Sequence, residues 1–282
     1  MHDEAIARNG KAAAKKTILY IVMIFFAVIM GIPFVWMLST SLKTPGQIFV
    51  YPPVWIPKPV QFSNYWDAWQ NANFSRYFLN SAFVTVVTVV GELLTSSLAA
   101  FSFSRLHYKG RDKLFLGYLA TMMVPKQVVM IPNFILMKQF NWINTYQALI
   151  MPGIFTAYGT FMLRQFLLSI PTELDEAATI DGCNKLQIYW YVIMPLAKAA
   201  LATLGVFSFI GSWNSFQWPL IVTNAEQMFT LPLGLSAFNS EHASNYALMM
   251  AGTVISVLPI LAIYCAAQKY FVEGIALSGI KG

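Results

Sequence analysis

Long apolar runs dominate this chain and restrict the fold that it can adopt. Hydrophobic residues make up 57% of the 282 residues and charged residues only 11%, against roughly 25% charged in soluble domains. Several runs approach the ~20 apolar residues that a helix needs to cross a bilayer. We expect an all-α integral membrane protein with six transmembrane helices, at residues 17–41, 77–103, 113–137, 147–168, 196–222 and 248–271. The third run is the weakest, because Pro125, Lys126 and Pro132 interrupt it.

The distribution of basic residues predicts the orientation of these spans. With the N-terminus in the cytoplasm, the predicted cytoplasmic segments hold thirteen of the 18 Lys and Arg residues and the external segments hold five. Cytoplasmic loops of membrane proteins carry this excess of positive charge. Residues 1–16 and 272–282 are then cytoplasmic tails of a six-span domain at 17–271. Anionic lipid at the inner leaflet accounts for the net charge of +6, so no nucleic acid partner is needed.

A polar stretch between the fourth and fifth predicted spans begins with the pattern of a short helix. Thr172 followed by Asp175 three residues later predicts a capping box. Three acids stand in the first turn, where the helix dipole favours negative charge: Glu173, Asp175 and Glu176. The stretch therefore predicts a cytoplasmic helix that is capped by Thr172.

The same stretch predicts a close contact and a sharp turn. Ala177 and Ala178 leave nearly bare backbone on one face of the helix, so another surface can approach closely. Gly182 can adopt the left-handed conformation that ends a helix, and a second helical pattern starts near Asn184. We expect a short helix, a sharp turn and another helix between two membrane spans.

Glu92 lies inside the second predicted span, beside Thr95, Ser96 and Ser97. A carboxyl group at membrane depth is costly and marks a pore, a relay or a buried partner. The neighbouring hydroxyl groups can form hydrogen bonds across helices, and their small size allows tight packing. Two interpretations stay open: structural packing, which the hydroxyl groups favour, and a direct contact with a substrate.

Polar and aromatic residues interrupt the fifth predicted span. Polar groups at this depth must face protein or water. Asn214 and Gln217 offer donors and acceptors suited to sugar hydroxyls, and three aromatic rings offer stacking faces: Trp213, Phe216 and Trp218. The segment predicts either part of a translocation path or a proline-kinked, tightly packed gate helix without direct sugar contact.

The motif Glu176-Ala177-Ala178, followed by Gly182, Ile193 and Pro195, resembles the Glu-Ala-Ala loop of binding-protein-dependent ABC import permeases. Flanking residues narrow the resemblance to the carbohydrate-type permeases, on the side of the maltose permease family: Arg164-Gln165-Phe166, Ile170-Pro171 and Ile180-Asp181-Gly182. Two further matches lie outside the loop, Trp213-Asn214 with Trp218-Pro219 and the C-terminal Gly274–Gly282. The resemblance covers most of the chain, from about Ile18 to the end.

This resemblance implies a loop that docks into a groove on a cytoplasmic ATPase subunit, with Glu176 facing a basic group there. The implied loop residues are Asp175, Glu176, Ala177, Ala178, Asp181, Gly182 and Pro195. It also implies a second homologous permease subunit, two ATPase subunits and an extracytoplasmic solute-binding protein as partners. The residues that resemble the loop reaching the solute-binding protein are Phe229, Thr230, Leu231, Pro232 and Gly234; by themselves they are typical of an exposed turn with an apolar anchor.

The chain has no phosphate-binding loop of its own. Its nearest sequence, Gly10-Lys11-Ala12, lacks the first glycine and the hydroxyl residue of that motif. If ATP powers transport, another polypeptide must hydrolyse it. We therefore expect a permease subunit that is not an enzyme and holds no cofactor or metal.

The leading hypothesis is a permease subunit of an ATP-driven importer for a sugar or oligosaccharide, in a prokaryotic inner membrane. The same class of importer for glycerol phosphate or another polar solute is an alternative. A secondary carrier and an intramembrane enzyme are alternatives from other classes. An enzyme is disfavoured because the three histidines, His2, His107 and His242, lie outside the predicted spans.

Overall fold

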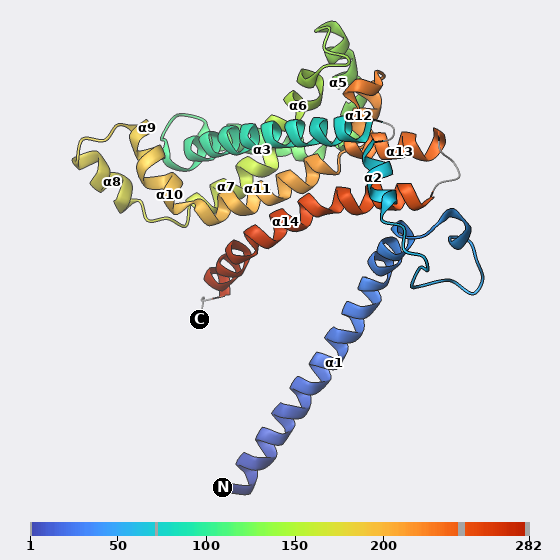
Figure 1. Cartoon of the computed structure of the whole chain (residues 1–282). Helices are drawn as coiled ribbons and strands as arrows, with labels where there is room; N and C mark the ends of the chain where they lie inside the picture. The colour runs from blue at the N-terminus through green and yellow to red at the C-terminus, as the bar shows by residue number, and fades with distance from the viewer. Residues whose placement is uncertain (1, 71–72, 242–245, 280–282) are drawn as a thin grey trace. The chain divides into compact units, whose positions relative to one another are not determined.

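A computed structural model describes residues 2–70, 73–241 and 246–279, and no strand occurs among them (Figure 1). The chain divides into two compact units. The smaller unit comprises Met1–Trp69 with Asn239–Val254, and the larger comprises Gln70–Phe238 with Ile255–Gly282. An all-helical fold agrees with the expectation from the apolar runs.

The smaller unit is built on one long helix, α1 (His2–Ser41). Its part from Lys15 to Ser41 is long and apolar enough to cross a membrane, and none of its most apolar stretch is buried. After α1 come the short turn η1 (Pro45–Gln47) and helix α2 (Ser63–Gln70). The side chain of Asn64 fixes α2 to the end of α1 by donating hydrogen bonds to the carbonyl oxygens of Ser41 and Lys43, both 2.9 Å long.

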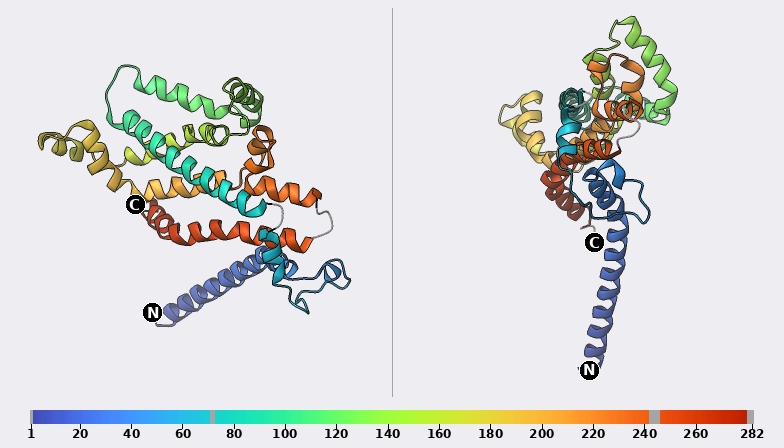
Figure 2. Two further views of the ribbon diagram at one scale, coloured as in Figure 1. Left: turned by 45° about the horizontal axis from the view of Figure 1, so that its top comes forward. Right: turned by 45° about the vertical axis from the view of Figure 1, so that its right-hand side comes forward.

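The larger unit is organised around α3 (Phe74–Arg105), which contacts α6 (Tyr146–Ile154), α7 (Ala157–Leu167) and α11 (Lys198–Trp213) (Figure 2). The other elements of its first half are α4 (Arg111–Ala120), η3 (Thr121–Met123) and α5 (Lys126–Gln139). The later elements are α8 (Glu173–Ile180), α9 (Lys185–Gln187), η4 (Ile188–Ile193), α10 (Met194–Leu196), α12 (Gln217–Val222), η5 (Glu226–Met228) and α13 (Leu231–Glu241). Helix α14 (Tyr246–Gly279) contributes its C-terminal part.

Helix α3 has the inside-out pattern of a membrane helix. Its buried face is largely polar and includes Asn80, Ser81, Thr85, Thr88, Glu92, Ser96, Ser97 and Arg105. Exposed apolar residues recur every three or four positions on the opposite face: Leu79, Phe83, Val86, Val90, Leu94 and Leu98. In lipid, polar groups must find partners inside the protein, and small polar side chains let helices approach closely. The exposed face of α3 is therefore suited to lipid or to another apolar helix.

Three of the predicted spans are not single helices in the structure. Run 113–137 bends by 98° between η3 and α5, at Pro125, since a proline disfavours helical backbone in the residue before it. Run 147–168 is broken between α6 and α7, just after Pro152 and Gly153. The helix leading into run 196–222 bends by 79° between α10 and α11, and the run breaks again between α11 and α12.

The number of helices fit to cross a membrane follows from these breaks. Three described helices are long and apolar enough: the Lys15–Ser41 part of α1, α3, and the Tyr246–Gln268 part of α14. The number rises to five if each of the two sharply bent pairs forms one span. Helix α14 continues to Gly279, past the predicted end of its span at 271; residues 280–282 of the predicted C-terminal tail lie outside the described residues.

Candidate functional site

Helix α8 occupies the predicted polar loop, but it does not begin in the predicted way. Thr172 has helical backbone angles (φ −72°, ψ −21°), and its side chain caps no backbone N–H group. A capping residue needs extended backbone to aim its oxygen at the helix start. Asp175, the expected partner of the capping box, is instead 3.3 Å from Arg105 through its Oδ2 atom. The predicted capping box is therefore wrong.

The turn at the end of α8 agrees with the prediction from Gly182. This glycine has φ +86°, in the left-handed region that other residues rarely adopt. Its N–H donates to the carbonyl of Thr179 (3.1 Å), and the N–H of Cys183 donates to that of Ala178 (2.9 Å). These two bonds satisfy carbonyl groups that the end of α8 would otherwise leave unpaired. Asp181 stands just before the glycine and is exposed.

The second helix of the loop begins at Asn184, as predicted, with a capping box that the sequence analysis did not identify. The Asn184 side chain accepts from the Gln187 N–H (2.9 Å), and the Gln187 side chain accepts from the Asn184 N–H (2.8 Å). The spacing of Asn184 and Gln187 is the sequence signal of this motif. The helix continues through the π-helical η4 and α10, where Pro195 is exposed, and then bends into α11.

Ala178 does not provide the open face that was predicted for it. Its side chain is only 9% exposed and joins a buried apolar cluster that also contains Leu163, Leu167, Ile188 and Tyr189. Helix α8 thus packs its alanine face partly against η4 of its own chain. Of the two alanines, Ala177 alone remains exposed.

Arg105, at the C-terminal end of α3, is the residue of this site that the sequence analysis missed. From the sequence, Arg105 is only one of the thirteen Lys and Arg residues in the predicted cytoplasmic segments. Its Nη2 donates to the carbonyl oxygens of Leu167 (2.7 Å) and Ile170 (2.8 Å), while its Nη1 lies 3.3 Å from Asp175. Helical spacing offered a signal, because Ser97, Phe101 and Arg105 follow each other at four-residue intervals on the buried face of α3.

The outward face of α8 carries both charge and apolar surface. Glu176 is exposed, and no hydrogen bond or ion pair joins its side chain to the described part of the chain. Ile180, one turn later, is 87% exposed, a large fraction for an isoleucine. Such a face, with its underside fixed by Arg105 and Ala178, is suited to contact with another protein.

The predicted path residues fall into two groups at the break between α11 and α12. Trp213 is buried, stacks on Phe209 with ring centroids 5.6 Å apart, and donates from Nε1 to the carbonyl of Ser256 (3.0 Å). Trp218 donates from Nε1 to the carbonyl of Ala148 (2.8 Å), and Phe216 is half-buried. The amides Asn214 and Gln217 are exposed. The tryptophans thus hold the break in place and leave the amides accessible.

Glu92 is buried where α3, α7 and α11 meet. Its Oε1 accepts a hydrogen bond from Thr156 Oγ1, at the start of α7, and its Oε2 accepts one from Ser208 Oγ of α11, both 2.5 Å long. A carboxyl group with two such partners is well satisfied inside the protein. These contacts of Glu92 join three helices, as the structural-packing interpretation of this residue describes.

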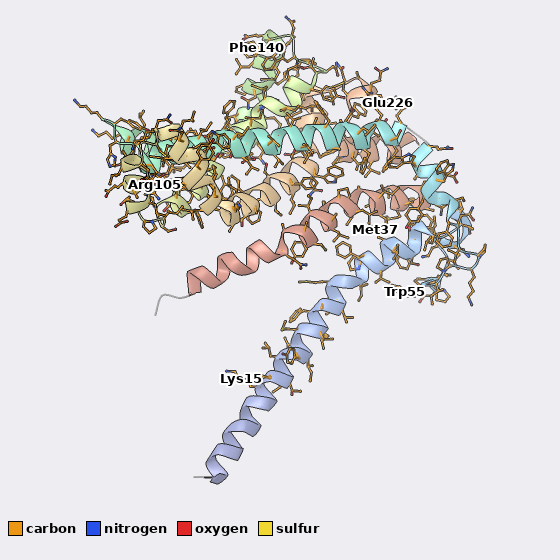
Figure 3. The ribbon with its side chains drawn as sticks, turned by 60° about the vertical axis from the view of Figure 1, so that its left-hand side comes forward. Lys15, Met37, Trp55, Arg105, Phe140 and Glu226 are labelled. Carbon is orange, nitrogen blue, oxygen red and sulfur yellow. The ribbon has the colours of Figure 1, made fainter. Side chains whose placement is uncertain are left out.

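The segment after α12 includes Glu226. It lies at one end of α3, and Arg105 is at the other end (Figure 3). Asn80 of α3 donates to the carbonyl oxygens of Gln227 (2.8 Å) and Phe229 (2.9 Å), and Ser81 accepts from the Leu231 N–H (2.7 Å). Glu226 itself accepts hydrogen bonds from Tyr77 (2.6 Å) and Asn73 (2.8 Å), which lower the pKa of its carboxyl group. These bonds tie the segment to the start of α3.

The prediction that residues 229–234 form an exposed turn is therefore wrong, because none of the five residues named for it is exposed. Thr230, Leu231 and Gly234 are buried, and Phe229 and Pro232 are half-buried. A Cβ atom on Gly234 would lie 2.1 Å from the Tyr77 ring, so only glycine permits this packing. The accessible residues are its neighbours Asn224, Glu226 and Gln227.

Several known proteins are similar to this chain over most of its length. The permease protein AraQ of the arabinooligosaccharides transport system of Halalkalibacterium halodurans is 34% identical, over 86% of this chain and 86% of the relative. The lactose transport permease protein LacG of Rhizobium radiobacter is 33% identical, over 93% of this chain and 95% of the relative. The diacetylchitobiose uptake permease protein NgcG of Streptomyces coelicolor is 30% identical, over 94% of this chain and 89% of the relative.

A solved structure shares the fold. It is a chain of a bacterial ABC transporter involved in the import of the acidic polysaccharide alginate, with a TM-score of 0.80 and 27% identity, covering 90% of this chain and 95% of that chain. The model of the binding-protein-dependent transport system inner membrane component family matches residues 92–276, which include α8, Arg105 and the α11–α12 break. The chain belongs to this family of multi-pass membrane permeases.

Proposed function

We propose that this chain is a permease subunit of an ATP-driven importer that brings a sugar or oligosaccharide into the cell. The observation that carries the proposal is helix α8. Arg105 and Ala178 fix its underside, while Glu176, Ala177 and Ile180 are left exposed for a partner. The names of its relatives, which refer to arabinooligosaccharides, lactose and diacetylchitobiose, support a carbohydrate as the transported solute.

The proposed topology has six spans and both termini in the cytoplasm. It counts the bent pair Arg111–Met123 and Lys126–Gln139, the α6–α7 pair and the broken run 196–222 as one span each. Polar backbone exposed at such breaks is tolerated at membrane depth when it faces protein or a water-filled cavity. Helix α8 then lies in the cytoplasm, in agreement with the excess of Lys and Arg in the predicted cytoplasmic segments.

The proposed partners are two cytoplasmic ATPase subunits, a second homologous permease subunit and an extracytoplasmic solute-binding protein. Helix α8 docks on an ATPase subunit, where the Glu176 carboxylate faces a basic group and Ile180 fills an apolar depression. Because Thr230 and Leu231 are buried, the solute-binding protein contacts the accessible neighbours Asn224 and Gln227. ATP binding draws the docked helices together, and hydrolysis releases them.

The proposed solute path passes the break between α11 and α12. Asn214 and Gln217 present their amides to the solute, because hydroxyl-rich molecules need both donors and acceptors. Trp213 and Trp218 position this break through their bonds to Ser256 and Ala148. Glu92 holds α7 and α11 together through Thr156 and Ser208 and does not touch the solute.

Copurification and uptake test this function. The chain is expressed with the proteins encoded beside its gene, purified by a tag, and reconstituted into liposomes with the solute-binding protein. Arabino-oligosaccharides, lactose and diacetylchitobiose serve as probes. We expect an ATPase subunit to copurify and at least one probe to enter only when ATP is present on the α8 side. Uptake driven by an ion gradient without an ATPase would contradict the proposal and indicate a secondary carrier.

A further inference from the structure

Arg105 joins three elements of the larger unit at one point. It ends α3, it donates to the carbonyl of Leu167 at the end of α7, and it pairs with Asp175 of α8. A third bond reaches the carbonyl of Ile170, in the short connection between α7 and α8. The side chains of Arg105 and Asp175 are only 4% and 15% exposed. This contact is therefore a buried polar clamp and not a surface ion pair.

The chemistry of this clamp requires arginine. A planar guanidinium group can donate to several acceptors in fixed directions, whereas the lysine ammonium is a compact point charge on a flexible chain. One of the carbonyl groups that Arg105 binds belongs to Leu167, the last residue of α7, and the other belongs to Ile170 in the connection that follows. Removing one member of a buried pair leaves the other charge uncompensated, which is strongly destabilising.

Helix α3 extends from this clamp into the centre of the bundle. Glu92 stands on the same unbroken helix, about 20 Å from Arg105 at 1.5 Å per residue. There it accepts hydrogen bonds from Thr156 of α7 and Ser208 of α11. A displacement of α8 that moves Arg105 thus reaches α11 through one rigid helix with polar contacts at both places.

A second connection from α8 to the bundle is apolar. Ala178 packs in the cluster with Ile188 and Tyr189 of η4. Apolar packing is not directional, so it permits α8 to slide or tilt on η4. The two carbonyl bonds of Arg105 hold the end of α7 and the connection after it, and its ion pair with Asp175 is a directed contact from α3 to α8.

We propose that Arg105 is a positioning residue that transmits the movement of helix α8 to α3 and α11 during the ATP cycle. The inference rests on the proposed function, since it takes α8 as the element that the ATPase moves. Arg105 touches neither ATP nor solute. Its loss therefore separates ATP hydrolysis from the rearrangement of the transport path.

The test follows movement at Asn214, the exposed amide at the end of α11. A cysteine replaces Asn214 on a Cys183→Ser, Cys265→Ser background, in the purified complex with its ATPase and second permease. Its rate of reaction with a maleimide is measured without nucleotide and after trapping with ATP and vanadate, so no transported solute is needed. The test variants are Asp175→Asn and Arg105→Lys, because neither truncates the buried clamp. Asp112→Asn is the matched control, since Asp112 also pairs with arginines (3.0 Å to Arg111, 3.7 Å to Arg164) but is 69% exposed.

In the parent complex, whose Arg105 and Asp175 are unchanged, trapping with ATP and vanadate should change the labelling rate of the cysteine at position 214 by about fivefold or more. This is the size of a typical allosteric coupling. In the complexes that assemble, Asp175→Asn and Arg105→Lys should each reduce this change to less than about twofold, while the nucleotide-free labelling rate stays at the parent value. Asp112→Asn should respond like the parent. A full response in both clamp variants would overturn the role of Arg105 while leaving the importer proposal intact. A parent complex that binds no ATPase would overturn both.

Discussion

Replacing Glu176 with lysine should abolish ATP-driven uptake while the protein still reaches the membrane. Glu176 is exposed on α8, and within residues 2–70, 73–241 and 246–279 its side chain has no hydrogen bond or ion pair. The fold therefore does not need this carboxylate, but a basic group on the ATPase would. Truncating one partner of a buried interfacial charge pair costs about 2–5 kcal/mol, so the lysine, which also repels the basic group, should weaken association by about thirtyfold or more. Membrane yield, copurified ATPase and uptake measure the effect.

Two further variants separate this contact from other effects of charge. Glu173→Lys places the same charge change in the same first turn of α8, where both positions interact with the helix dipole. It should retain most of the uptake. Glu176→Gln removes the charge without adding a repulsive one and should have an intermediate effect. Normal ATPase association and normal uptake with Glu176→Lys would refute the docking of α8 through this residue.

Replacing Gly182 with valine should be equally damaging, for a different reason. At φ +86°, a residue with a Cβ atom costs about 1–2 kcal/mol, and a β-branched residue costs more. No atom lies within 4 Å of the position that a Cβ would take, so the strain is in the backbone alone. The turn should change its conformation, and α8 and α9 should then meet at the wrong angle. We expect a loss of uptake of about tenfold or more.

Asparagine at the same position is the matched control for this variant. It tolerates the left-handed region far better than valine, and the open space around Gly182 accepts its side chain. Gly182→Asn should therefore retain near-normal uptake and ATPase association. If Gly182→Val also transports normally, the angle between α8 and α9 has no part in coupling.

The sequence predicted best the features that depend on local backbone chemistry. The left-handed turn at Gly182 and the start of a helix at Asn184 follow from residue types within a few positions. The break near Pro125 likewise follows from the geometry of proline. Apolar runs of membrane length predicted the helical class, because about 20 consecutive apolar residues are what a helix needs to cross a bilayer.

Features that depend on tertiary contacts were not predictable in this way. Thr172 and Asp175 have the spacing of a capping box, yet Asp175 pairs with Arg105, which lies 70 positions earlier in the chain. Ala178 looks like open backbone in the sequence, but η4 covers it. The segment from Phe229 to Gly234 looks like a loop, but Asn80 and Ser81 of α3 bind its backbone. In each case a distant partner decides between burial and exposure.

Breaks within the predicted spans show a further limit of hydropathy. The runs 147–168 and 196–222 are apolar enough to cross a membrane as a whole, and hydropathy does not register where the backbone turns. The breaks fall after Pro152-Gly153, at Ala197 and at Ser215-Phe216. The second of these follows Pro195, and the third precedes Trp218 and Pro219, so proline is the recurrent local signal.

The proposed import mechanism requires α8 to face the cytoplasm, and cysteine labelling measures which side of the membrane it faces. On a Cys183→Ser, Cys265→Ser background, single cysteines are placed at Thr179 and at Asn224, both exposed in the structure. An impermeant thiol reagent is added outside intact cells and, separately, after the membrane is opened. The cysteine at Asn224 should react in intact cells, and the cysteine at Thr179 should react only after opening. If the cysteine at Thr179 reacts in intact cells, α8 lies outside, no cytoplasmic ATPase can reach it, and the proposed import mechanism is wrong.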